Sequence, residues 1–133
     1  MAYSPLARGV LTGKYQLNQE LPEGSRAARG DARIHESELR DESLEVAMKL
    51  KPLAERLGKP MSQLALNWVL GNPIITSVIV GPRTMEKFED NLGCLDWEID
   101  DEALKEIDSL VPPGEHTGWG FNDPVMPVLG RPT

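Results

Sequence analysis

Apolar residues along this chain gather in blocks that favour short strands separated by helices. Residues 74–80 are nearly unbroken apolar and β-branched sequence, which is typical of a parallel strand buried on both faces. Residues 2–6 are interpreted as the end of another strand, with Pro5 marking its exit. Gly81 and Pro82 end the strand at 74–80, and a helix is expected to follow.

Apolar residues at three-and-four spacing predict further helices. One helix is expected from Glu42 to Leu57, and Pro52 either kinks it or begins a second helix. Residues 62–70 are apolar on almost every side, which predicts a helix wedged between a sheet and its neighbours. A last helix begins at Asp100, whose carboxylate can cap it. The expected core positions of the first and last of these helices are Val46, Ala47, Leu50, Leu53, Ala54, Leu57, Leu104, Ile107 and Val111.

The stretch after residues 74–80 combines features of an anion site. Thr84 can cap a helix there, and the first free amides of a capped helix point at an anion. Arg83 and Lys87 lie one turn apart and add positive charge on one side of the helix start. The spacing alone equally fits an ordinary strand-turn-helix unit with two surface cations. The expected inner face of this helix consists of Met85, Phe88 and Leu92.

Composition limits the class of protein. The chain has 133 residues with 40% hydrophobic content, which suits one compact domain. Its net charge of −7 argues against a general nucleic-acid or anionic-membrane surface. A single cysteine, Cys94, fits a reducing cytoplasm, and no apolar run is long enough for a membrane span. We therefore expect a cytoplasmic protein with neither nucleic acid nor membrane as partner.

Two stretches resemble one family. Residues 3–15, Tyr-Ser-Pro-Leu-Ala-Arg-Gly-Val-Leu-Thr-Gly-Lys-Tyr, resemble a segment of the aldo-keto reductases, including their channel-associated β subunits. Residues 80–91 resemble the family's signature for the adenosine end of the cofactor. The resemblance runs from Tyr3 to about Leu110 and implies an α/β fold, the C-terminal portion of a TIM (β/α)8 barrel with about two parallel strands. A complete barrel needs about 250 residues, so residues 1–133 are expected to be a single C-terminal fragment.

The resemblance also implies an NADP site. Tyr3 matches the aromatic residue that stacks on the nicotinamide, and Lys14 and Tyr15 match a cationic-aromatic pair near the pyrophosphate. Arg83 would bind the 2′-phosphate that only NADP carries, and Asn91 would hydrogen-bond the adenine amine. The matched positions are Tyr3, Ser4, Leu6, Ala7, Gly9, Lys14, Arg26, Gly81, Arg83, Lys87, Asp90 and Asn91. Lys87 stands where many members of the family have glutamine, which should strengthen a contact with phosphate. Asp90 stands where many have glutamate, which should shorten a contact with adenine.

The catalytic aspartate, tyrosine, lysine and histidine of the family lie on its first four strands, outside this chain by the same alignment. Lys14, Tyr15, His35 and His116 have suitable chemistry but match other segments, so no catalytic residue is assigned. No metal-ligand spacing occurs either. Residues 16–40 are polar and irregular, as expected of a cofactor-covering loop or a mobile one. Residues 112–133 form a tail in which Trp119 and Phe121 either reach the substrate or pack the tail down.

Three functions stay open at this point. The first is the C-terminal NADP(H)-binding part of an aldo-keto reductase, which in the complete protein acts with NADPH on a small carbonyl substrate. The second is a regulatory or binding module without catalysis, which pairs with another barrel fragment through its unpaired strand edges. The third is a nonfunctional truncated remnant.

Overall fold

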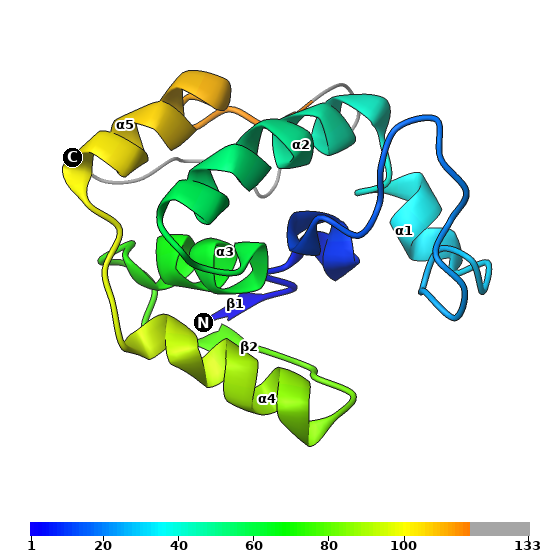
Figure 1. Ribbon diagram of the computed structural model, residues 1–133, viewed down its shortest axis with the longest axis horizontal. Helices are drawn as coiled ribbons and strands as arrows, with labels where there is room; N and C mark the ends of the chain where they lie inside the picture. Colours follow the sequence, from blue (N-terminus) through cyan, green and yellow to red (C-terminus); the bar gives the residue numbers. More distant parts are fainter. Residues whose placement is uncertain (118–133) are drawn as a thin grey trace.

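A computed structural model describes residues 1–117 of the chain (Figure 1). The elements in chain order are β1 (Ala2–Tyr3), η1 (Ala7–Thr12), α1 (Ala32–Glu36), α2 (Asp41–Arg56), α3 (Met61–Leu70), β2 (Val78–Ile79), α4 (Met85–Leu92), η2 (Gly93–Leu95) and α5 (Asp101–Leu110). The described part is thus a helix-rich α/β unit. None of the helices in it is long and apolar enough to span a bilayer.

The two strands pair in parallel, as predicted. Ala2 lies opposite Val78 and Tyr3 lies opposite Ile79. The predicted lengths were wrong, because only two residues of 2–6 and two of 74–80 form strand. Burial of the strand at 74–80 on both faces was also wrong, since Ile79 is 52% exposed, and its neighbour Tyr3 is 76% exposed. A parallel sheet is buried only when layers cover both faces, and the two-stranded sheet of residues 1–117 is left open on the face that carries these two side chains.

The helix α3 lies at the centre of the unit. In Figure 1 it lies between α2 on one side and the small sheet with α4 on the other. Leu64, Leu66 and Asn67 are buried, but Trp68 is 38% exposed. The prediction of a helix that is buried on every side was therefore correct at these three positions and wrong at Trp68, and the other residues of α3 are partly exposed.

The helix α2 continues from Asp41 to Arg56, so Pro52 does not begin a separate helix. Its apolar face matches the prediction and packs against α3 and α5. Leu53 is completely buried and belongs to one cluster with Leu64 and Ala103. The predicted cap of α5 is confirmed, because the Asp100 carboxylate accepts a hydrogen bond of 2.8 Å from the backbone N–H of Ala103.

Residues 16–40 are more ordered than an irregular loop, since they include α1. Ala27 and Ile34 are buried in a second cluster with Val10, Tyr15 and Ala47. The Tyr15 hydroxyl accepts a hydrogen bond of 3.3 Å from the N–H of Ala27. This segment is therefore packed onto η1 and α2.

The predicted inner face of α4 was wrong. Met85, Phe88 and Leu92 are 66%, 38% and 47% exposed, whereas Asn91 on another face is only 8% exposed. The helix contacts α3 through polar groups, so its hydrophobic stripe is left outside. Periodicity identified which side chains share a face but not which face packs inward.

Cys94 is a buried free thiol. Burial raises the pKa of the Cys94 thiol, and the negative charge of Asp96 raises it further. A raised pKa lowers the fraction of reactive thiolate, so Cys94 acts as a small packing residue here.

Candidate cofactor site

Parallel pairing of β1 and β2 brings the two family-like segments to one edge of the sheet. β1 runs directly into Ser4 and η1, and β2 runs into Gly81 and α4. Parallel strands leave a sheet at the same edge, and neighbouring strands are about 4.8 Å apart. The segment expected at the pyrophosphate and the segment expected at the adenosine end therefore start side by side.

The first segment has an unusual backbone. Ser4, Ala7 and Arg8 have φ angles of 52°, 45° and 53°, in the left-handed region that residues with a Cβ rarely adopt. Hydrogen bonds hold this shape, from the N–H of Ala7 to the Ser4 carbonyl at 2.9 Å and from the N–H of Gly9 to the Leu6 carbonyl at 2.8 Å. Such strain persists only where the surrounding structure enforces it, and it concentrates at ligand-binding loops.

An ion pair anchors the strained turn. The Arg8 guanidinium lies 3.0 Å from the Glu38 carboxylate, and both side chains are largely buried. The pair ties η1 to the segment that precedes α2. Arg8 was not among the expected site residues, and its role here is to hold the turn in shape.

Lys14 lies against Gly9. A Cβ added at Gly9 would come within 2.8 Å of both Cε and Nζ of Lys14. The Lys14 ammonium also lies 5.0 Å from the centroid of the Tyr15 ring, a cation–π contact. Because Tyr15 is only 1% exposed, Lys14 is the member of the pair that a ligand can reach.

Replacing Gly9 with alanine should lower the free energy of unfolding by about 2 kcal/mol, because a side chain is strained at this backbone angle. Gly9 has φ +102°, where any L side chain is strained. Gly24→Ala is the matched control, since Gly24 has φ +66° with nothing within 4 Å of an added Cβ. It should cost about 1 kcal/mol. Equal losses of unfolding free energy in urea would show that a side chain is no more strained at Gly9 than at Gly24.

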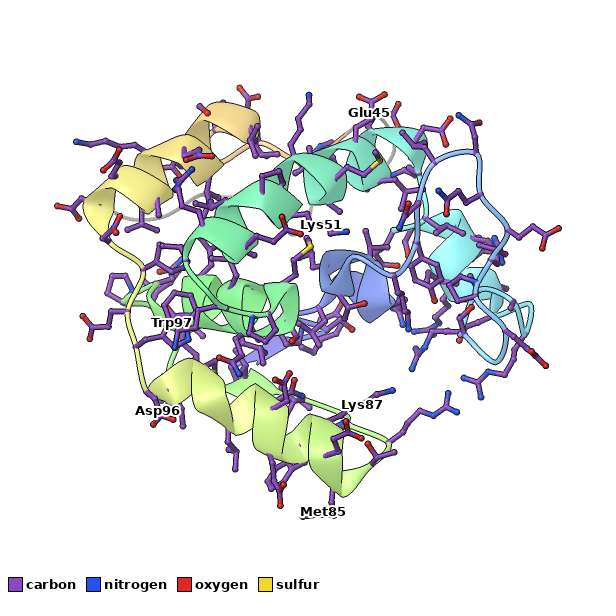
Figure 2. The ribbon with its side chains drawn as sticks, viewed as in Figure 1. Glu45, Lys51, Met85, Lys87, Asp96 and Trp97 are labelled. Carbon is purple, nitrogen blue, oxygen red and sulfur yellow. The ribbon has the colours of Figure 1, made fainter. Side chains whose placement is uncertain are left out.

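The start of α4 carries two exposed cations. The Thr84 hydroxyl accepts a hydrogen bond of 3.3 Å from the N–H of Lys87, which confirms the predicted cap. Figure 2 shows the Lys87 side chain on the side of α4 that faces η1, while Met85 points away from the rest of the unit. Arg83 precedes the cap and is exposed. Cations and the free amides of the first turn thus lie where an anion would bind.

The far end of α4 is held by α3. The Asp90 carboxylate accepts hydrogen bonds from the Ser62 hydroxyl at 3.0 Å and from the Gln63 amide at 3.2 Å. The same amide donates to the Asp90 carbonyl at 2.8 Å. Asn91 is buried beside it. Sequence reasoning missed Ser62 and Gln63, because hydrophobic periodicity carries no signal for a polar contact between helices.

Arg26 has a partner within its own loop. Its guanidinium lies 3.8 Å from the carboxylate of Asp31, which also accepts the capping hydrogen bond of α1 from the N–H of Ile34. His35 contacts the Ala27 carbonyl at 3.0 Å. These contacts give Arg26 and His35 structural roles in the described conformation.

Leu6 and Gly81 are the other expected site residues for which the structure gives contacts or free space. The Leu6 carbonyl accepts from the N–H groups of Gly9 and Leu11 in the turn. Gly81 has nothing within 4 Å of an added Cβ. Trp119 and Phe121 lie outside the described residues. Among residues 1–117, no group of three or more His, Cys, Asp and Glu side chains is arranged to hold a metal.

Comparison with known proteins identifies one family. The model of the aldo/keto reductase family matches residues 1–112. The chain is 35% identical over 118 residues to the uncharacterized oxidoreductase YrpG of Bacillus subtilis, covering 88% of this chain and 33% of that protein. It is 36% identical over 123 residues to L-glyceraldehyde 3-phosphate reductase of Escherichia coli O157:H7, covering 90% and 35%.

A third relative is not named as an enzyme. The chain is 33% identical over 117 residues to a putative voltage-gated potassium channel subunit beta of Schizosaccharomyces pombe, covering 82% of this chain and 33% of that protein. The chain thus spans about a third of the length of the curated relatives it matches.

Proposed function

The chain belongs to the aldo/keto reductase family, and on that premise we propose that it is the C-terminal NADP(H)-binding part of an oxidoreductase. The complete protein would transfer hydride between NADPH and an aldehyde or ketone in the cytoplasm. Residues 1–133 would form one end of a (β/α)8 barrel, with 16–40 covering the cofactor and 112–133 as the tail.

The parallel register of β1 with β2 is the observation that carries this proposal. Tyr3 is exposed at the end of β1, where an aromatic ring can stack on a nicotinamide. Arg83 follows the neighbouring strand by four residues, on the way into α4. A single extended ligand that leaves Tyr3 along the shared edge of the sheet therefore meets the α4 N-terminus.

The charges and backbone of the site suit a dinucleotide phosphate. The chain as a whole has a net charge of −7, yet Lys14, Arg83 and Lys87 place cations along this edge. The first turn of α4 supplies backbone amides. NADPH supplies the hydride when bound, and the residues of this chain bind and orient it.

The exposed apolar side of the unit supports the barrel proposal. The exposed residues near β1, β2 and α4 include Tyr3, Ile74, Ile79, Met85, Phe88, Leu92 and Leu95. Uncovered apolar surface beside two strand edges is what further strands and helices of a barrel would bury. We assign no catalytic residue to this chain.

Replacing Arg83 with alanine in the complete protein should weaken NADPH binding by about 10- to 100-fold, because a charged hydrogen bond contributes about 1.5–3 kcal/mol. NADH lacks the 2′-phosphate, so its affinity should stay unchanged. Lys105→Ala, which removes an exposed cation of α5 outside the proposed site, is the control. Cofactor fluorescence titration measures both affinities. Equal weakening for NADPH and NADH would contradict the assignment of Arg83 to the 2′-phosphate.

A binding module without catalysis is the second candidate. Its support is the same exposed apolar side, which another barrel fragment could cover. Sedimentation of the purified chain tests it: a self-associated or partner-bound species favours the module, whereas a monomer that binds no NADPH excludes the module.

A further inference from the structure

An open cavity of about 650 Å³ lies on the face of α3 that turns away from α4. Leu64, Ala65 and Trp68 line it, whereas Ser62, Gln63 and Asn67 of the same helix contact α4 and the residues after it. This helical spacing places the two sets on opposite faces. The cavity therefore lies on the other side of α3 from α4, and it borders the strained turn of the candidate cofactor site at Pro5 and Ala7.

The lining of the cavity is mainly apolar. Val46 and Leu50 of α2 face Ile107 and Leu110 of α5 across it. Two of its charged lining residues have partners, since Glu38 pairs with Arg8 and Arg40 donates to the Thr117 hydroxyl at 3.3 Å, and the third, Glu115, is exposed to solvent. A polar small molecule would find few groups to recognise it, whereas apolar side chains would gain by filling the space.

The chain itself runs along this cavity. Residues 111–115 and Thr117 belong to its lining. The Thr117 hydroxyl lies 2.8 Å from the Ser43 hydroxyl, which fixes the end of this run beside the first turn of α2. The next residues therefore start at the rim of the cavity.

We propose that residues 118–133 of this chain dock in this cavity and cover it. Their apolar side chains are Trp119, Phe121, Val125, Met126, Val128 and Leu129, and they include Pro124, Pro127 and Pro132. Frequent prolines favour an extended segment that can lie in a groove. Trp119 is two residues from Thr117, within about 7 Å of the rim.

Tethering favours this occupant over a separate molecule. A segment that starts at the rim is present at a high effective concentration, so modest apolar contacts suffice. The segment also reaches far enough, because α2 is about 24 Å long and an extended chain covers that in about eight residues. The docking site lies between α2, α3 and α5.

The test measures alkylation of a single thiol by N-ethylmaleimide in the complete protein, with Cys94 replaced by alanine. The thiol of a Val46→Cys variant would lie in the cavity. Glu45→Cys is the matched control, since Figure 2 shows Glu45 on the outer side of α2. Each variant is compared in the full chain and in a chain that ends at Thr117. A full-length Trp119→Ala, Phe121→Ala variant repeats the comparison without shortening the chain.

Docking predicts that the Val46→Cys thiol reacts about tenfold more slowly in the full chain than after either change in the tail. The Glu45→Cys thiol should react equally in all three. Equal rates for Val46→Cys in all three would show that the tail leaves the cavity open. Protection that survives both changes would mean that another part of the protein fills it, and either result overturns the proposal.

Discussion

Replacing Asn67 with leucine is expected to lower the free energy of unfolding by about 3 kcal/mol or more. The Asn67 amide donates to the Cys94 carbonyl at 2.8 Å and to the Trp97 carbonyl at 2.5 Å. Its oxygen accepts from the N–H of Ile99 at 3.2 Å. Leucine has a similar size but no polar atoms, so three backbone groups would lose their partner. Each buried group left without one costs about 1–3 kcal/mol.

The matched control is Asn72→Leu. The Asn72 side chain accepts one exposed hydrogen bond, from the N–H of Ile74 at 3.1 Å. Its loss should cost less than about 1 kcal/mol, because water can replace it. Urea unfolding of both variants measures the difference. A loss of under 1 kcal/mol for Asn67→Leu would show that the connection after α4 is held by other contacts.

Asn67 also bears on the proposed function. It ties the stretch between α4 and α5 to α3, and α4 carries Lys87 near the candidate phosphate site. If that stretch loosens, the start of α4 loses its fixed place relative to β1. Asn67→Leu should therefore weaken NADPH binding although the residue is remote from the cofactor, whereas Asn72→Leu should not.

Replacing Leu53 with alanine should destabilise the protein by about 3 kcal/mol, within the range of 2–5 kcal/mol typical of buried leucines. Leu53 has no exposed surface and packs in one cluster with Leu64 of α3 and Ala103 of α5. Three helices surround the side chain, so the structure has little freedom to collapse into the space left behind.

Met48→Ala on the same helix is the control, since Met48 is 48% exposed. This variant should lose no more than about 1 kcal/mol of unfolding free energy. Thermal or urea unfolding of both variants measures the contrast. Similar losses for the two positions would indicate that the α2, α3 and α5 core is loosely packed in solution.

Helix caps and helix faces were predictable because they depend on near neighbours in sequence. Thr84 and Asp100 cap α4 and α5 as expected, since a side-chain oxygen needs only an N–H three residues ahead. The buried face of α2 followed from its spacing for the same reason. The orientation of α4 did not, because a contact of Asp90 with Ser62 and Gln63 decides which face turns inward.

The strained turn was also beyond sequence reasoning. Ser4, Ala7 and Arg8 are not residue types that favour positive φ, so the pattern gave no sign of their conformation. Long-range contacts, such as the Arg8 pair with Glu38, hold it in place. The resemblance to the family marked this segment as a candidate site, and only the tertiary structure revealed the shape of its backbone.

The sequence by itself determined the family, the positions of the main helices and the local caps, because motifs and periodicity involve residues close together in the chain. Tertiary structure decided the parallel register of Ala2 with Val78, the outward apolar side of α4 and the cavity beside Thr117. These features join residues that are distant in sequence. Their energies depend on which surfaces meet, and that information appears only once the chain is packed.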